Sequence, residues 1–316
     1  MSHQSSRRSA RILCAGVIVL DEIFRIEEFP RPDGKVQANG FFVVNGGCAA
    51  NASVAVARLG GRALLAAPMG GPKGVDVNGD RVLRALRREH VDCAFCQRIH
   101  GLTTPVSAIF MNSRGDRSIV TYCDQRIAAT TPTDADVAVA GADVLLADNC
   151  FPDFVLPLCA AARRRRLPVV LDGDRRTVAK DPLFRLATHV IFSSQCLRET
   201  TGAADLAGGL KRIACNTDAF IAVSNGPGDI LYLEGRTVRR LPVFSIAAVD
   251  TVGAGDAFHG GFALALAEGQ SEVEAMRFGA AVAAIKCTRL GGSAGIPGRS
   301  EVEALIAEGR LPAAAQ

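Results

Sequence analysis

A glycine-rich stretch near the carboxyl end of the chain, Gly253-Ala254-Gly255-Asp256, leads directly into an apolar segment typical of a helix. The first backbone N–H groups of a helix have no partner within it, and the helix dipole favours an anion at that end. Small residues leave the N–H groups of Gly253, Ala254 and Gly255 accessible. The stretch therefore predicts a phosphate cradle with a carboxylate beside it.

The carboxylate of Asp256 is placed to accept a proton from a hydroxyl that attacks a bound phosphoryl group. Phosphoryl transfer proceeds through a loose transition state, so a weak base suffices and positioning carries most of the catalysis. The helix dipole predicts that Asp256 stays ionised at neutral pH. The stretch has neither the Gly-Lys-Ser/Thr of a P-loop nor the G-x-G-x-x-G of a dinucleotide site after a first strand.

A second set of candidate residues lies early in the chain. Asp21 follows the apolar run "RILCAGVIVL", which predicts a first strand, while Gly46 and Gly47 open a predicted helix with Asn51 one turn inside it. Ligands of open α/β sheets collect at the carboxyl ends of the strands, so we expect these residues to bind substrate. A turn position for Asp21 and a surface position for Asn51 are the alternative interpretations.

The elements that must position these residues follow from hydrophobic patterning. Apolar, β-branched runs alternate with helical segments along the chain, which predicts an α/β fold with a mostly parallel central sheet flanked by helices. Residues 22–45 and 103–123 break this rhythm and predict paired strands in a small β-sheet that forms a lid over the site. We expect a disordered tail over residues 1–10 and one domain over residues 11–316.

Composition excludes several classes of function. The chain has 316 residues and a net charge of +4, and its basic residues form no stripe with aromatic residues, which argues against nucleic acid as a partner. The amino-terminal segment resembles a signal peptide, but acidic residues follow its apolar part and no small-residue cleavage site does. No apolar run reaches the length of a membrane span. We expect a cytoplasmic protein that binds no membrane.

The ten cysteines are scattered singly through apolar segments, as reduced core cysteines are, so a disulfide framework is not expected. One group differs, because His90, Cys93, Cys96 and His100 together offer four possible zinc ligands. Their spacing is not that of a standard zinc finger, and "VDCAFC" is also typical of a strand after a helix. Both metal binding and packing stay open for this group.

Two segments carry a resemblance to a known family. "DTVGAGDAF" at residues 250–258 and "NGGCAANASVAVARLG" at residues 45–60 resemble the two signatures of the ribokinase-like (PfkB-type) carbohydrate kinases, and the likeness extends from about residue 11 to residue 309. The resemblance implies a ribokinase-like fold with a β lid, ATP as the phosphoryl donor and Mg2+ carried by the nucleotide. It also allows for a monovalent cation such as K+.

The resemblance implies roles for individual residues. Asp256 is similar to the catalytic base of the family, and Gly253 to Gly255 are similar to its anion hole. The positions that match sugar-binding residues are Asp21, Gly47 and Asn51, and we assign Gly46, beside Gly47, to substrate binding as well. The positions that we assign to nucleotide binding are Ser224, Asn225, Gly226, Thr251, Gly253, His259 and Cys287.

Within the family, the chain is most similar to sulfofructose kinase and then to ketohexokinase, on segments such as "GVIVLDEIF", "VLDGD" and "KCTRLGGSAGIP". Cys150 stands where sulfofructose kinases carry an arginine, and Thr121 where they carry an asparagine. Loss of a guanidinium and an amide weakens recognition of a sulfonate. Residues 193–196 also lack the family's Asn-x-x-Glu, which helps to organise water on the metal.

The function that we predict is ATP-dependent phosphorylation of a small sugar, either a ketose or a ketose derivative. Sulfofructose kinase proper and a catalytically silent sugar or nucleotide sensor are the alternatives, whereas the single glycine of "CAGVIVLDEIF" disfavours a nicotinamide dehydrogenase. Lys35, in the predicted lid turn "PDGK", is a candidate contact to an anionic group or a ring hydroxyl of the substrate. The apolar face of the predicted lid sheet further predicts a homodimer that forms through the lid.

Overall fold

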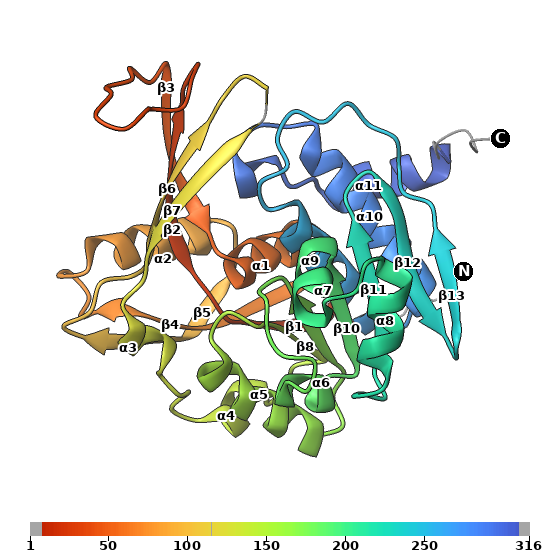
Figure 1. Ribbon diagram of the computed structural model, residues 1–316. Coiled ribbons are helices and arrows are strands. Elements are labelled where there is room, and N and C mark those ends of the chain that lie inside the picture. Colours follow the sequence, from red (N-terminus) through yellow and green to blue (C-terminus); the bar gives the residue numbers. More distant parts are fainter. Residues whose placement is uncertain (1–7, 115, 310–316) are drawn as a thin grey trace, which may run out of the picture.

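The computed structural model describes residues 8–114 and 116–309, and its centre is a nine-stranded sheet with the order β13-β12-β11-β10-β9-β8-β1-β4-β5 (Figure 1). From β11 to β5 in this order neighbouring strands pair in parallel, whereas β12 and β13 form an antiparallel extension at one edge. The strands of this sheet are β1 (Arg11–Ala15), β4 (Arg62–Gly71), β5 (Asp92–His100), β8 (Val144–Asp148), β9 (Val169–Gly173), β10 (His189–Ser193), β11 (Phe220–Asn225), β12 (Gly228–Glu234) and β13 (Thr237–Leu241).

Helices cover both faces of the sheet because the central strands are apolar on both sides. In β1, Ile12 and Cys14 point into one hydrophobic core and Leu13 and Ala15 into the other. The first core is closed by α1 (Cys48–Arg58), α2 (Val77–Arg88), α9 (Ala254–Ala267), α10 (Glu272–Cys287) and α11 (Arg299–Glu308). The second core is closed by α3 (Gln125–Ala128), α4 (Ala135–Val139), α5 (Pro152–Arg164), α6 (Pro182–Leu186), α7 (Ser194–Thr201) and α8 (Leu206–Ala214).

A separate four-stranded sheet, which we call the lid sheet, rises from the main sheet (Figure 1). Its order is β3-β2-β6-β7, with β2 (Val19–Arg25), β3 (Gly40–Gly46), β6 (Val106–Met111) and β7 (Arg117–Tyr122). One face carries the buried side chains of Asp21, Ile23, Ser107 and Ile109, since pairing places these residues side by side. The predicted α/β fold, with a mostly parallel sheet and a small β lid, is confirmed.

The apolar run over residues 11–20 forms two strands in different sheets, so the prediction of one first strand was wrong. Gly16 divides the run with φ 145°, in a region that side chains rarely adopt. A Cβ at Gly16 would also overlap the carboxylate of Asp148. As a consequence Asp21 lies within β2 of the lid sheet rather than at the end of β1.

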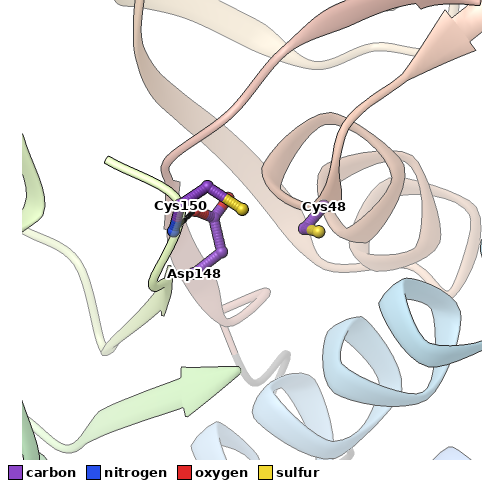
Figure 2. Close-up of side chains that lie close together, drawn as sticks. All are labelled: Cys48, Asp148 and Cys150. Atoms are coloured by element: carbon purple, nitrogen blue, oxygen red, sulfur yellow. Dashed lines mark hydrogen bonds between the residues drawn. The ribbon is translucent and has the colours of Figure 1, made fainter. Parts of the chain in front are cut away.

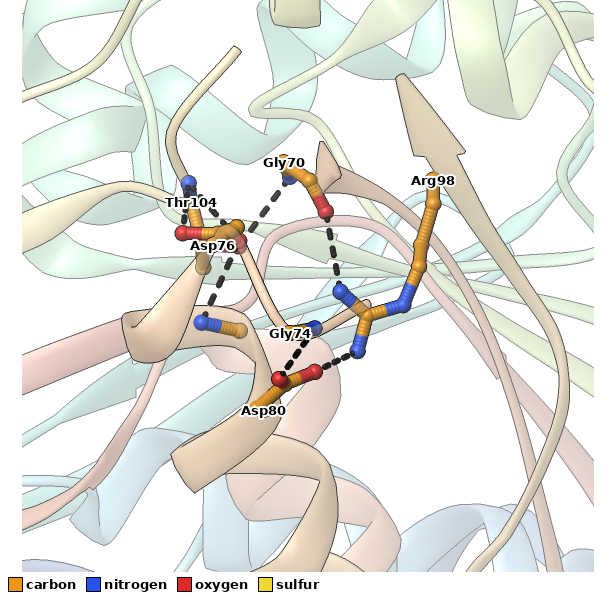
Figure 3. A network of polar contacts seen from close by, with 7 residues as sticks. Gly70, Gly74, Asp76, Asp80, Arg98 and Thr104 are labelled. Carbon is orange, nitrogen blue, oxygen red and sulfur yellow. Dashed lines mark hydrogen bonds and ion pairs between the residues drawn. The ribbon is translucent and has the colours of Figure 1, made fainter. Parts of the chain in front are cut away.

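A polar network fixes the chain where it passes from the main sheet to the lid sheet (Figure 3). Asp76 caps the start of α2 by accepting from the Gly79 N–H at 3.2 Å, and it also accepts from the Thr104 hydroxyl. The same hydroxyl accepts from the Gly70 N–H, at the end of β4. Because Asp76 and Thr104 are buried, the network holds the segment before β6 firmly against β4 and α2.

Within the described residues, no helix is both long enough and apolar enough to cross a membrane. The predicted disordered tail covers residues 1–10, of which residues 1–7 lie outside the described residues.

Candidate active site at the carboxyl ends of the parallel strands

The order of the main sheet places a ligand site between β1 and β8. The chain leaves β1 for the lid and then joins β4 on one side, whereas β8 is followed by β9 on the other side. Ligands of such sheets bind where the order reverses, at the carboxyl ends of the strands. Asp148 ends β8 at this point, and α9 contacts β1, β8 and β9.

Asp256 lies in the first turn of α9 and is held by Asn51, which lies one turn inside α1. The Asn51 Nδ2 donates to the Asp256 Oδ2 at 2.7 Å. Gly253 is the N-cap of α9 with φ 75°, and a Cβ there would lie 3.3 Å from the Asn51 Nδ2. The two sequence segments, 205 residues apart, thus meet in the folded chain.

The start of α9 has the features of an anion cradle. No side chain caps this helix, and the Ala254 N–H donates to the Thr251 carbonyl at 3.3 Å. The N–H groups of Gly255 and Asp256 are next in the first turn, where the helix supplies no acceptor. A Cβ at Gly255 would have no heavy atom within 4 Å, so the space in front of the turn is open to a ligand.

Burial raises the pKa of Asp256 above its usual range, and the neighbouring charge of Asp174 adds to this effect. The hydrogen bond from Asn51 acts in the opposite direction, because it stabilises the ionised form. The position of Asp256 in the first turn of α9 also favours the ionised form, which is the reason that the sequence predicts an ionised carboxylate. Desolvation outweighs both effects and brings Asp256 closer to the pKa of an effective base at neutral pH.

Asp21 extends from the lid sheet toward this site. Burial raises its pKa to about 6, the charge of Asp256 contributes, and the Ser107 hydroxyl partly compensates by hydrogen bonding. The carboxylate lies directly against Gly46, where a Cβ would overlap it. Gly47, the N-cap of α1, has φ 93°, and a Cβ there would lie 2.5 Å from the Val17 carbonyl oxygen. The two glycines therefore allow β3, α1 and Asp21 to approach one another.

Residues to which the sequence analysis gave no role in the site complete it. Asp148 and Asp172 end β8 and β9, and burial raises the pKa of Asp148 to about 6 and that of Asp172 well above its usual range. The thiols of Cys48 and Cys150 lie beside Asp148 (Figure 2). Carboxylates that directly follow apolar runs, as in "LLAD" and "VLDG", were the available signal for the two acids.

A buried ion pair supports the loop before α9. Lys286 is fully buried in α10, and its Nζ lies 3.2 Å from the Asp250 Oδ2 and donates to the Asp250 carbonyl at 2.7 Å. Asp250 also accepts from the N–H groups of Val252, Gly291 and Gly292. Burial opposes ionisation of Asp250, but these N–H donors and Lys286 outweigh it and lower its pKa.

The predicted nucleotide-binding residues divide into two groups. Ser224 and Asn225 end β11, and Gly226 follows with φ 57°, so all three lie at the carboxyl edge of the sheet. Thr251 is exposed in the loop before α9 and accepts from Arg117 of β7 at 3.0 Å.

Of the remaining three, Gly253 is the N-cap of α9, and His259 and Cys287 contact protein groups. His259 is buried, with Nδ1 2.8 Å from the Gly255 carbonyl and 3.4 Å from Asp172, and Nε2 3.3 Å from the Ile191 carbonyl. Burial lowers the pKa of His259, which keeps the ring neutral beneath the site. The Cys287 carbonyl accepts from the Val249 and Asp250 N–H groups.

Lys35 was a predicted substrate contact, and the group of His90, Cys93, Cys96 and His100 was left open between metal binding and packing. Lys35 is exposed in the long loop between β2 and β3, which Figure 1 shows at the far tip of the lid sheet. His90 and His100 are exposed before and at the end of β5, with Cys93 and Cys96 between them. Among the described residues, the possible metal-binding groups of three ligands include none of these four.

Comparisons with known proteins agree with this geometry. The family model described as pfkB family carbohydrate kinase matches residues 9–299. The ribokinase of Haemophilus influenzae is 27% identical over 90% of this chain and 95% of its own length. The ribokinase of Bacillus subtilis is 26% identical over 94% of this chain and 99% of its own length.

Solved structures show the same fold. The crystal structure of a proposed ribokinase from Agrobacterium tumefaciens is 34% identical, has a TM-score of 0.89, and covers 95% of this chain and 98% of its own. The structure of Arabidopsis thaliana ribokinase complexed with ribose and ATP is 21% identical, has a TM-score of 0.82, and covers 95% and 99% of the two chains. These relatives are ribokinases rather than sulfofructose kinases or ketohexokinases.

Proposed function

The chain belongs to the pfkB family of carbohydrate kinases, and from this premise we propose that it transfers the γ-phosphoryl group of ATP to a hydroxyl of a small sugar, with Asp256 as the catalytic base. The observation that carries the proposal is the contact between Asn51 and Asp256 at the open start of α9. It combines a carboxylate of raised pKa with unpaired helix N–H groups in one place.

In the proposed reaction Asp256 is the proton acceptor, and each bond that forms is matched by one that breaks. Asp256 takes the proton of the sugar hydroxyl as the hydroxyl oxygen bonds to the γ-phosphorus, and the bond from that phosphorus to the bridging oxygen of ADP breaks. The N–H groups of Gly255 and Asp256 stabilise the negative charge that spreads over the phosphoryl oxygens, whereas the predicted N–H of Ala254 already donates to the Thr251 carbonyl. General base catalysis of this kind typically contributes about 10^2- to 10^4-fold in rate.

Two polar groups support sugar binding beside Asp256. The Oδ1 of Asn51 is buried and has no hydrogen-bond partner among the described residues, so a sugar hydroxyl would satisfy it. Asp21 offers a buried carboxylate from the lid sheet. These two acceptors are our proposed sugar contacts, and Gly46 and Gly47 allow the segments that carry them to pack together.

The nucleotide is proposed to lie along the edge formed by Ser224, Asn225 and Gly226 and to reach the start of α9 past Thr251. Mg2+ would accompany the nucleotide and neutralise phosphate charge. The exposed carboxylate of Asp174 is an oxygen ligand of the type that Mg2+ prefers, so the site fits this ion. We do not propose direct contacts for His259, because both of its ring nitrogens face protein groups.

A monovalent cation such as K+, in contrast to Mg2+, does not fit the residues that could hold it, which lie in the loop before α9. The buried carboxylate and carbonyl of Asp250 would suit such an ion, but the Lys286 ammonium already contacts both. We propose that the chain supplies this positive charge itself and needs no K+ there.

The choice of sugar is proposed at the level of class. The two curated relatives are ribokinases, which favours ribose as the substrate. The segments that resemble sulfofructose kinase and ketohexokinase favour a ketose instead. Both kinds of sugar present a primary hydroxyl on a five-membered ring. Cys150 and Thr121 offer weaker anion recognition than arginine and asparagine, so we propose a neutral sugar in preference to a sulfonated one.

A coupled ADP-release assay with ribose, fructose, 6-sulfonated fructose and a nucleoside tests the proposal, with Asp256→Asn as the matched blank. We expect sugar-dependent ADP release with ribose or fructose that Asp256→Asn abolishes. Thermal stabilisation by sugar and ATP without any ADP release would instead support a silent sensor.

A further inference from the structure

Two cysteines from distant parts of the chain meet at the point where the sheet order reverses. Cys48 is the first residue of α1, and Cys150 follows β8 by two residues. Figure 2 shows the sulfur of Cys150 directed toward Cys48, which lies across from Cys150 and Asp148. The Sγ atoms of both cysteines and a carboxylate oxygen of Asp148 all lie within 4.8 Å of one another.

From this geometry we propose that Cys48, Cys150 and Asp148 form a binding site for a thiophilic divalent cation such as Zn2+, placed at the mouth of the sugar site. Zinc takes four ligands in a tetrahedron, with sulfur at about 2.3 Å, which places two sulfur ligands about 3.8 Å apart. Ligand atoms within 4.8 Å of one another therefore reach this geometry by rotation of the two short thiol side chains.

The carboxylate of this site is already oriented by protein groups. Asp148 accepts from the Val17 N–H at 2.7 Å and from the Cys150 N–H at 2.9 Å. Gly16 leaves the space that the carboxylate occupies, since a Cβ there would overlap it. A metal ligand held by such outer contacts loses little freedom on binding, which favours the metal complex.

The surroundings of the thiols favour positive charge. Cys48 also lies within 4.8 Å of carboxylate oxygens of Asp172 and Asp256, which gives a bound ion a possible fourth ligand. A divalent cation would replace the two thiol protons and offset the negative charge of these carboxylates.

Ligand type separates this site from the Mg2+ that accompanies ATP. Mg2+ binds oxygen in octahedral geometry and does not select thiolates, whereas sulfur ligands select zinc and related soft ions. Because Cys48 is three residues from Asn51 and its thiol is close to Asp256, an ion here would obstruct the sugar hydroxyl. We therefore expect Zn2+ to inhibit the proposed kinase reaction. This expectation rests on the proposed function, whereas the binding of Zn2+ does not.

Binding is tested on the full-length, untagged protein by titration of Zn2+ against a chromogenic chelator, without sugar or nucleotide. We expect one Zn2+ per chain with an affinity that millimolar Mg2+ leaves unchanged. Cys48→Ser and Cys150→Ser should each weaken binding by at least about 10-fold, as loss of a ligand requires. The control Cys215→Ser, at an exposed cysteine beyond α8, should bind Zn2+ like the wild type.

Substitution of Co2+ gives a second readout that does not depend on activity. Two thiolate ligands produce a sulfur-to-cobalt charge-transfer band in the near ultraviolet, and each serine variant should lose part of it. Equal zinc affinity in wild type, Cys48→Ser and Cys150→Ser would overturn the proposal and point to the other cysteines, such as Cys93 and Cys96. Absence of stoichiometric zinc binding in the wild type would also overturn it.

Discussion

At the scale of single residues, the site depends on carboxylates whose pKa values are raised by burial. Asp256, Asp21, Asp148 and Asp172 all show this direction of shift, and each is also close to another acid of the group. Neutral hydrogen-bond donors such as Asn51 compensate only in part. The folded protein therefore retains charge repulsion in the site, and a sugar and Mg2+ would relieve it.

The stability of the protein should change with pH through Asp21. Its pKa of about 6 in the folded state lies above the usual 3.8, so between these values the folded state binds more protons than the unfolded state. The free energy of unfolding then falls as pH rises through this window, and the loss is complete above pH 6. Two pKa units correspond to about 3 kcal/mol.

Asp21→Asn should therefore stabilise the protein by up to about 3 kcal/mol at pH 7.5 and by much less at pH 4.5, while weakening sugar binding. Denaturant unfolding at both pH values measures the difference, and Asp218→Asn, at an exposed carboxylate, is the control. Equal stabilisation of Asp21→Asn at the two pH values would contradict a raised pKa for Asp21.

The residues of the site that belong to local patterns could be predicted from the sequence. Gly47 and Gly253 have positive φ and Gly46 lies against the Asp21 carboxylate, so these positions require glycine and leave a signal in the sequence. Cys48, Cys150 and Asp148 leave no such signal, because their proximity depends on the pairing of β1 with β8 and on the position of α1. Long-range pairing of this kind is not encoded in any short segment.

At the scale of elements, the loop before α9 is held by residues outside it. The pair of Asp250 with Lys286 joins this loop to α10, and Gly291 and Gly292 donate from the segment after α10. The sequence indicated the glycine cradle but not this support, since one lysine in an apolar helix can also extend to the surface. The structure shows that Lys286 is fully buried instead.

Lys286→Met tests whether this ammonium replaces a monovalent cation. Removing one partner of a buried ion pair costs roughly 3 to 5 kcal/mol, so the variant should unfold at lower temperature than the control Lys180→Met, at an exposed lysine. The wild-type turnover should be the same in KCl and NaCl of equal ionic strength, whereas KCl should raise the unfolding temperature of Lys286→Met. Strong activation of the wild type by K+ would show that a separate cation site exists.

At the scale of the whole molecule, the lid sheet leaves apolar surface uncovered. Its face away from Asp21 carries a cluster of Phe24, Phe41 and Phe110, with ring centroids 4.9 and 5.6 Å from that of Phe24. Val120 and Tyr122 of β7, on the same face, are 64% and 58% exposed. A face of this kind is the reason for the proposed homodimer, which would cover it.

Sedimentation at micromolar concentration should therefore give a dimer for the wild type and a monomer for Val120→Glu. The control Val178→Glu replaces a valine of similar exposure, 66%, outside the lid sheet and should remain dimeric. A wild-type monomer that retains full activity would refute assembly through the lid.

The main sheet with its helices and the lid sheet could both be predicted from the sequence. The point where the chain passes from one sheet to the other could not. Alternating apolar runs and helical patterns predict the parallel sheet, and polar turns predict the lid sheet. The continuous run over residues 11–20 hides the point where the chain passes from one sheet to the other. Gly16 marks this point through its contact with Asp148, a residue 132 positions away.

The central claim is that Asp256 removes the proton of the attacking hydroxyl, and turnover of Asp256→Asn tests it most directly. The amide keeps the shape and the neighbouring Asn51 but cannot accept the proton, so we expect a loss in kcat of about 10^2-fold or more with little change in the affinity for sugar or ATP. Binding of both ligands, measured by calorimetry, separates this loss from misfolding. Near-wild-type kcat in Asp256→Asn would contradict the account.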